Sequence, residues 1–276
     1  MAGIHVVTDF LSGHSSWTRR MAATVVMALS LMSSACVTTT TGPYSANQSK
    51  DKAAEQYVAL GINYLREGNL ELATARTKRA LELRPNYAEA LAVLGLIYQT
   101  QEEYPLAEQN YKDALSADSE FTRGRTYLAS LYYKQRKLDQ ALAEFEKASE
   151  DIRYPARSQV FENIGLIKFQ QGKTEESIAA YRKSLALDRD QPGLQLKLAE
   201  LFAKLQDYEQ ANRYYDNFRE SVRQGALLHT PGSLELGIDL ARRRGDDDTV
   251  SSLKLVLRNL YPKSPENQRE QARGNS

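Results

Sequence analysis

The chain has very little of what catalysis and disulfide chemistry require. Its single cysteine, Cys36, excludes an intramolecular disulfide. Two of its three histidines precede Cys36, which leaves His229 as the only imidazole in the rest of the chain. The sequence contains no His/Cys cluster with zinc-site spacing and no glycine-rich phosphate loop. We therefore expect no cofactor, no metal centre and no enzymatic activity.

Two features leave weak alternatives open. A Ser/His/Asp triad could be built on His229, but nothing near it resembles a nucleophile elbow, and a loop position between two repeats accounts for it. The acidic run Asp246-Asp247-Asp248 lacks the rest of a calcium loop. Such a run is more typical of a negatively charged cap at the start of a helix.

The chain also lacks an excess of charge of either sign. The chain has 36 basic and 35 acidic side chains. Removal of residues 1–35 takes away Arg19, Arg20 and Asp9, so that 36 − 2 and 35 − 1 both leave 34. A formally neutral protein gives no reason to expect nucleic acid as a partner.

The amino-terminal region resembles a bacterial lipoprotein leader. Arg19 and Arg20 precede an apolar stretch over residues 21–32, and Ser33-Ser34-Ala35 leads into Cys36. The apolar stretch is too short for a permanent transmembrane helix and fits a secretory signal. The small residues before the cysteine resemble a lipobox, although Ser33 stands where leucine is usual. An ordinary signal peptide with an incidental cysteine is the alternative.

This leader predicts how the two ends of the chain are organised. We expect residues 1–35 to be a signal peptide, Cys36 to be lipidated and residues 36–52 to form a flexible tether. The residue after the cysteine is Val37 and not aspartate. Under the bacterial lipoprotein sorting pattern, this predicts that the protein is attached to the outer membrane and faces the periplasm. Residues 262–276 are polar and contain Pro265 and Gly274, so we expect a flexible tail.

Small residues recur along the chain at a spacing of 34. Gly61, Gly95 and Ala129 show this spacing, and Gly165 and Ala199 repeat it after a two-residue insertion. Each is followed twelve positions later by a second small residue, namely Ala73, Ala107, Ala141, Ser177 and Ala211. Small residues at paired positions allow two helices to pack closely, which large side chains would prevent.

The residues around these positions resemble the tetratricopeptide repeat. Leucine precedes the small residue and tyrosine follows it in the first two units, as Leu60 and Tyr64 illustrate, and Pro85 ends the first unit. The predicted fold is all-α, a right-handed superhelical solenoid of about six helix pairs over residues 53–261. Its units lie near 54–87, 88–121, 122–155, 158–191, 192–225 and 230–261. The sixth is the weakest match, and terminal repeats often diverge because they cap the stack.

Several local features bear on this assignment. Gly68, Gly172 and Gly245 lie where turns would need a positive φ, and Pro105 lies near the start of a second helix. Three departures from the repeat pattern predict looser packing or a shifted register, namely Lys168 in place of tyrosine and Arg125 and Gln195 in place of the leading aromatic.

A second apolar stripe on the first predicted helix suggests where a partner binds. Val58, Ile62 and Leu65 lie roughly 120° from the packing stripe that includes Leu60 and Gly61, at about 100° per residue. In tetratricopeptide arrays this stripe lines the concave groove. Its positions include Leu96 and Gln99 in the second unit and Leu234, Ile238 and Ala241 in the sixth. An apolar groove suits an amphipathic helix or an extended peptide. Contact with the next unit or the preceding linker alone is the alternative.

Four segments are less generic than the repeat. They are YPARSQVFENIGL at 154–166, DRDQP at 188–192, GIDLARRRGDDD at 237–248 and LRNLYPKSPE at 257–266, and they resemble the type IV pilus biogenesis lipoproteins of the PilW/PilF type, the pilotins. This resemblance implies a lipidated outer-membrane protein that binds the pilus secretin subunit and promotes its localisation and multimer assembly. We expect the protein itself to be monomeric. A periplasmic adaptor for outer-membrane barrel assembly or for peptidoglycan enzymes is the alternative function.

Overall fold

The computed structural model describes residues 43–274, and these residues form helices joined by turns, with no strand among them. The helices are α2 (Pro43–Arg66), α3 (Leu70–Leu83), α4 (Ala88–Thr100), α5 (Tyr104–Ala117), α6 (Thr122–Lys134), α7 (Leu138–Ser149), α8 (Arg157–Gln170), α9 (Thr174–Leu187), α10 (Pro192–Lys204), α11 (Tyr208–Arg223), α12 (Pro231–Arg244), α13 (Asp247–Leu260) and α14 (Pro265–Gly274). Residues Asp51–Ser276 form one compact unit, which contains all the packing described below.

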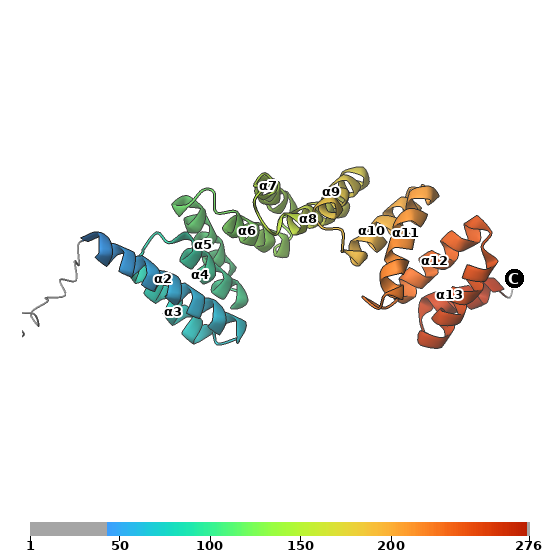
Figure 1. The fold of residues 1–276 in the computed structure, drawn as a ribbon, viewed down its shortest axis with the longest axis horizontal. Coiled ribbons are helices and arrows are strands. Elements are labelled where there is room, and N and C mark those ends of the chain that lie inside the picture. The colour runs from blue at the N-terminus through green and yellow to red at the C-terminus, as the bar shows by residue number, and fades with distance from the viewer. Residues whose placement is uncertain (1–42, 275–276) are drawn as a thin grey trace, which may run out of the picture. The chain divides into compact units, whose positions relative to one another are not determined.

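The helices α2 to α13 follow one another as six antiparallel pairs (Figure 1). The pairs coincide with the six predicted repeat units, the sixth included, so the all-α helix-pair prediction is confirmed. Their apolar side chains form four clusters between residues 54 and 261. Each cluster joins helices that are near one another in the sequence, which is typical of a repeat array.

Close packing at the small residues explains their 34-residue period. A Cβ atom added at Gly95 would lie 2.6 Å from Cε1 of Tyr111, sixteen residues later on the second helix of the same unit. At Gly165 it would lie 2.5 Å from Cδ1 of Tyr181, at the same separation in sequence. The glycines therefore leave the space that the aromatic rings fill, and the ring–glycine contact recurs because it is local to each unit.

The turns between paired helices share a left-handed residue. The predicted positive φ is confirmed at Gly68, Gly172 and Gly245, with φ of 77°, 76° and 71°. The equivalent turns hold Glu102, Arg136 and Gln206 at φ of 61° to 63°. A non-glycine residue in this region costs about 1 to 2 kcal/mol, so the array tolerates strain at three turns to keep one turn geometry. The prediction for Pro105, in the first turn of α5, is also confirmed.

Polar side chains replace aromatic packing at the predicted departures. Lys168 is mostly buried, and its Nζ lies 2.8 Å from Glu176 and 3.4 Å from Glu146, which joins α8 to α9 and α7. The Arg125 Nη1 donates to Glu144 at 2.8 Å, and its Nη2 donates to the Ser119 carbonyl at 2.8 Å. At these two positions the predicted loosening is wrong, because ion pairs between helices take the place of ring contacts.

The structure also corrects the prediction for both ends of the array. Helix α2 begins at Pro43, so the proposed flexible tether over residues 36–52 is wrong from that residue onward; the rest of it lies outside the described residues. The proposed flexible tail over residues 262–276 is wrong because α14 forms there and buries Asn267 and Glu270 against its neighbours. The signal peptide and Cys36 fall outside the described part of the chain. No helix within that part has the length and apolar character to span a membrane.

Candidate protein-binding surface

The predicted stripe on α2 divides into a buried and a half-exposed part. Val58 is 2% exposed and belongs to a core cluster with Ala90, Val93 and Ile97 of α4, so its side chain offers no surface to a partner. Ile62 and Leu65 are half-buried and pack against the same cluster. The groove assignment is thus corrected at Val58, because the neighbouring unit covers that position.

The packing stripe needs a correction as well. Leu60 was expected to face the neighbouring helix, yet it is 42% exposed. Two other residues of this stripe make the packing contacts. Tyr57 packs against the core cluster of the first two units, and Gly61 lies against Thr77 of α3. Leu60 therefore adds an apolar side chain to the surface of the first unit.

In the second unit, Leu96 and Gln99 are both half-buried. Leu96 packs against the central core cluster, which also contains Tyr111. The Gln99 Oε1 accepts a hydrogen bond of 2.9 Å from the Tyr111 hydroxyl. Burial raises the pKa of Tyr111, so this hydroxyl stays a donor at neutral pH. The bond fixes the Gln99 side chain and leaves its amide NH2 available to donate elsewhere.

The middle units carry a mixed aromatic and cationic surface that the sequence did not indicate. Phe169 of α8 is half-buried, and the ammonium groups of Lys197 and Lys204 lie 4.6 and 5.9 Å from its ring centroid. Both lysines come from α10, the first helix of the next unit. The Tyr133 hydroxyl accepts a hydrogen bond of 2.6 Å from Gln170, which links α6 and α8 in the same way. The ring–cation contacts bring an aromatic ring of one unit together with two ammonium groups of the next, one of which, that of Lys197, also pairs with Glu200 at 3.3 Å.

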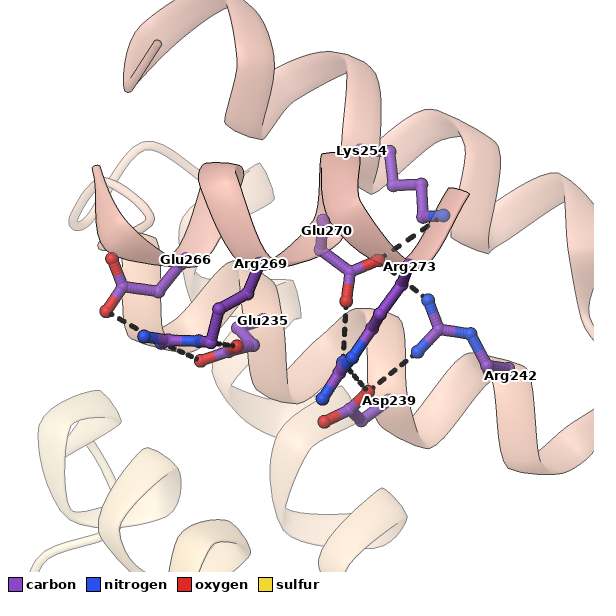
Figure 2. A network of polar contacts seen from close by, with 8 residues as sticks. All are labelled: Glu235, Asp239, Arg242, Lys254, Glu266, Arg269, Glu270 and Arg273. Carbon is purple, nitrogen blue, oxygen red and sulfur yellow. Dashed lines mark hydrogen bonds and ion pairs between the residues drawn. The ribbon is translucent and has the colours of Figure 1, made fainter. Parts of the chain in front are cut away.

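The last unit is closed by α14. The expected groove residues Leu234, Ile238 and Ala241 are fully buried. In Figure 2, α14 lies against α12 through two arginines, with Arg269 donating to Glu235 at 2.8 and 2.7 Å and Arg273 to Asp239 at 3.1 Å. Each of these pairs is 34 residues apart. Helix α14 therefore takes the place of the first helix of a seventh repeat.

A buried carboxylate lies at the centre of this network. Glu270 is 4% exposed, and it accepts from Arg242 and Arg273, both at 2.7 Å, and lies 3.3 Å from Lys254 of α13 (Figure 2). Burial by itself would raise the pKa of Glu270, but hydrogen bonds from Arg242, Arg273 and Lys254 outweigh it and hold that pKa below its usual value.

Comparison with known proteins agrees with this architecture. The sequence profile of the tetratricopeptide repeat matches residues 58–121 and 165–211. The chain is 38% identical to the type IV pilus assembly protein PilF of Pseudomonas aeruginosa strain PAO1, over 91% of this chain and 98% of that protein. The chain therefore belongs to the PilF family of type IV pilus assembly proteins.

Solved structures show the same relationship. The structure of P. aeruginosa PilF superposes with a TM-score of 0.71, at 38% identity, and the match covers 82% of this chain and 99% of that one. The crystal structure of PilW, a type IV pilus biogenesis factor, gives a TM-score of 0.61 at 23% identity, with 79% and 98% coverage. The second similarity shows a shared fold.

In this PilF-family chain, the two features that the sequence left open, His229 and the acidic run at 246–248, lie at the starts of α12 and α13. The His229 Nδ1 lies 3.1 Å from the Ser233 hydroxyl, and burial, aided by Arg219, lowers the pKa of His229. The Ser233 hydroxyl accepts a hydrogen bond from the Thr230 backbone N–H and donates one to the Thr230 carbonyl, both at 2.9 Å. These bonds belong to a capping box at the start of α12, so the hydroxyl is not poised as a nucleophile. Asp246 accepts from the Thr249 N–H at 3.0 Å, which confirms the predicted cap.

No metal site was found either. Over residues 43–274, no three His, Cys, Asp or Glu side chains gather in a way that could hold a metal ion.

Proposed function

We propose that this PilF-family protein is an outer-membrane lipoprotein scaffold, a pilotin, that binds the type IV pilus secretin subunit and promotes its localisation and multimer assembly. Its relationship to P. aeruginosa PilF, a protein named for type IV pilus assembly, supports this over nearly the whole of both chains. The lipobox-like sequence before Cys36 supports the membrane anchor.

The partner surface that fits this function lies on the first two units. It consists of Ile62 and Leu65 on α2 and Leu96 and Gln99 on α4, all half-buried. Half-buried apolar side chains still have area to lose to a partner, and the free NH2 of Gln99 can donate to a backbone carbonyl of a bound segment. An amphipathic helix or extended segment of the secretin matches this combination.

The anchor and the surface would act together without any bond being made or broken. A lipid on Cys36 would hold the protein at the membrane, so that a captured secretin subunit is kept there at high local concentration. Binding through a surface and retention through a tether are separable, which makes each of them testable by its own substitution.

Isolation of the protein from detergent-solubilised envelopes tests the partner. The secretin subunit should co-purify with the wild-type chain in stoichiometric amounts. Co-purification of barrel-assembly proteins or peptidoglycan enzymes, without the secretin, would instead support the periplasmic-adaptor alternative.

A further inference from the structure

Large apolar side chains are exposed where one repeat unit joins the next. Ile152 and Leu228, in the connections that follow α7 and α11, are both 78% exposed. Leu187 and Leu260 end α9 and α13 and are 49% and 59% exposed. Single exposed leucines are ordinary. Here one such side chain occurs at each of four successive connections, and we call these four residues the apolar row.

The connections that carry the apolar row lie on one edge of the array. In an array of antiparallel pairs, every unit begins and ends at the same edge, because all first helices run in the same direction. Contacts between connections agree with this geometry. The Asp151 carboxylate accepts a 2.7 Å hydrogen bond from Thr122 at the start of α6. The Tyr261 hydroxyl, just after α13, donates to the His229 carbonyl, just before α12.

The chain enters the compact unit at this same edge. Asp51 lies on α2, and its carboxylate is 3.3 Å from the guanidinium of Arg84, which follows the last residue of α3. Fourteen residues separate Asp51 from Cys36 in the sequence. The segment that leads to Cys36 therefore joins the compact unit at the edge that carries the apolar row.

Basic side chains accompany the apolar row. Arg153, Arg189 and Lys263 are exposed and make no ion pair among the described residues. The neighbouring carboxylates of Asp151 and Asp188 are engaged locally, since each accepts the backbone N–H two residues further on, at 3.0 and 3.1 Å. The three cations are exposed to solvent and can reach phosphate groups, but the nearby carboxylates keep their charge, and Arg153 interacts electrostatically with Asp151. Because acidic side chains are present on this edge too, we expect the apolar contacts to contribute more than net charge.

We propose that this edge rests on the phospholipid surface to which Cys36 tethers the protein, with the apolar row in the headgroup region and the basic side chains at the lipid phosphates. This inference rests on the lipid anchor of the proposed function. Such docking would set the orientation of the protein on the membrane. The helices run from the docked edge to the opposite edge, so their axes would point away from the bilayer and the partner surface would face along the membrane plane.

Tryptophan reporters can test the contact directly. The chain has one tryptophan, Trp17, so a protein of residues 43–276 has none. That protein keeps all four apolar clusters and should fold. Ile152→Trp and Leu228→Trp each place one reporter in the apolar row. Leu106→Trp is the matched control, because Leu106 is 46% exposed at the start of α5, on the opposite edge.

Vesicles of phosphatidylethanolamine and phosphatidylglycerol serve as the probe. We expect the emission of the Ile152→Trp and Leu228→Trp proteins to shift to the blue and to be quenched by brominated acyl chains, while the control stays unchanged. The double substitution Ile152→Glu with Leu228→Glu should weaken vesicle binding about tenfold or more, whereas Leu106→Glu should not. Circular dichroism would establish that each variant is folded.

Three results would overturn the inference: no shift at either reporter, an equal shift in the control, or a shift that requires a protein fraction and not vesicles. The last would indicate a protein partner for this edge. These outcomes are independent of the lipid anchor, because the tested protein lacks Cys36. A lipidated wild-type chain whose edge does not contact vesicles would leave the proposed function intact and remove only this inference.

Discussion

Arg269 and Glu235, 34 residues apart, form a two-point ion pair in which Nε and Nη2 lie 2.8 and 2.7 Å from the two carboxylate oxygens. The pair joins α14 to α12 at the same separation in sequence that relates equivalent positions of successive units. Helix α14 contains no large apolar residue, so polar contacts must hold most of it. The array thus ends in half a repeat with a solvent-compatible outer face, as a capping element requires.

Removal of the buried charge should loosen this cap. Glu270→Gln leaves Arg242, Arg273 and Lys254 without their shared anion, and hydrogen bonds to charged groups contribute about 1.5 to 3 kcal/mol each. We expect amide hydrogens of α14 to exchange faster while those of α12 keep their protection. Glu209→Gln is the control, since Glu209 pairs with Arg213 in a largely exposed i,i+4 contact that should contribute almost nothing. Unchanged exchange in α14 would contradict the role given to Glu270.

The same carboxylate predicts how the cap responds to acid. The pKa of Glu270 is lower in the folded protein than in the unfolded chain, where glutamate titrates at about 4.3. Its contribution is therefore complete above that unfolded value and is lost as the pH falls through the lower, folded value. The protection factors of the α14 amides, which correct for the intrinsic pH dependence of exchange, should fall selectively below about pH 4 and stay constant between pH 6 and pH 8. The Glu270→Gln variant should lack this acid-dependent step.

Gly95→Leu should damage folding more than binding. Even the first added carbon would lie 2.6 Å from the Tyr111 ring, and overpacking costs about 1 to 3 kcal/mol or more. The melting temperature should fall by several degrees. Gly193→Ala is a matched control in α10, where an added Cβ meets nothing within 4 Å and alanine favours the helix. A wild-type melting temperature for Gly95→Leu would mean that the helix crossing is not at this residue.

The six units were predictable because the information that sets them is local. A small residue and the side chain sixteen positions later, such as Gly95 and Tyr111, specify each pair, and the 34-residue period repeats the pattern. Helix α14 was missed because it has no apolar period; its charges matter only once α12 is folded beside it. Ser264-Pro265, 34 residues after Thr230-Pro231, was the available signal for its start.

The candidate surface could be predicted less well than the fold. Periodicity on α2 indicates which face of the helix a residue occupies, but not how far the neighbouring unit covers that face. Val58 and Ile62 lie on the same stripe, yet the first is buried and the second half-exposed. The lysines beside Phe169 come from the next unit, so no pattern within α8 indicates them.

Cys36→Ser should release the protein from membranes. The apolar stretch and the small residues before Cys36 predict lipidation there. Fractionation should show the variant in the soluble periplasmic fraction and the wild type in the outer-membrane fraction. In the pilotin interpretation the secretin should then be poorly localised, although it still binds the released protein. Membrane attachment of the variant at the wild-type level would argue against a lipid anchor at this residue.

Substitution of Ile62 and Leu65 by glutamate should weaken capture of the secretin. Both side chains are half-buried on α2, so part of each faces solvent in the free protein and could be covered by a partner. An unpaired charge placed in a dry contact costs several kcal/mol, which corresponds to a loss of affinity of about a hundredfold or more. Leu106→Glu introduces the same charge at a more exposed leucine on α5, outside the set of residues that makes up this surface, and should bind normally.

Titration of the purified secretin subunit into each folded variant measures this loss. Because Ile62 and Leu65 also pack against the core cluster of the first two units, Leu65→Gln provides a milder variant that adds no charge. We expect it to keep its melting temperature within a few degrees and to lose about tenfold in affinity. Wild-type affinity in a folded double variant would place the partner elsewhere, with the aromatic and cationic surface around Phe169 the next to test. If both variants unfold, these residues belong to the core and the half-exposed part of the stripe is structural, as Val58 is.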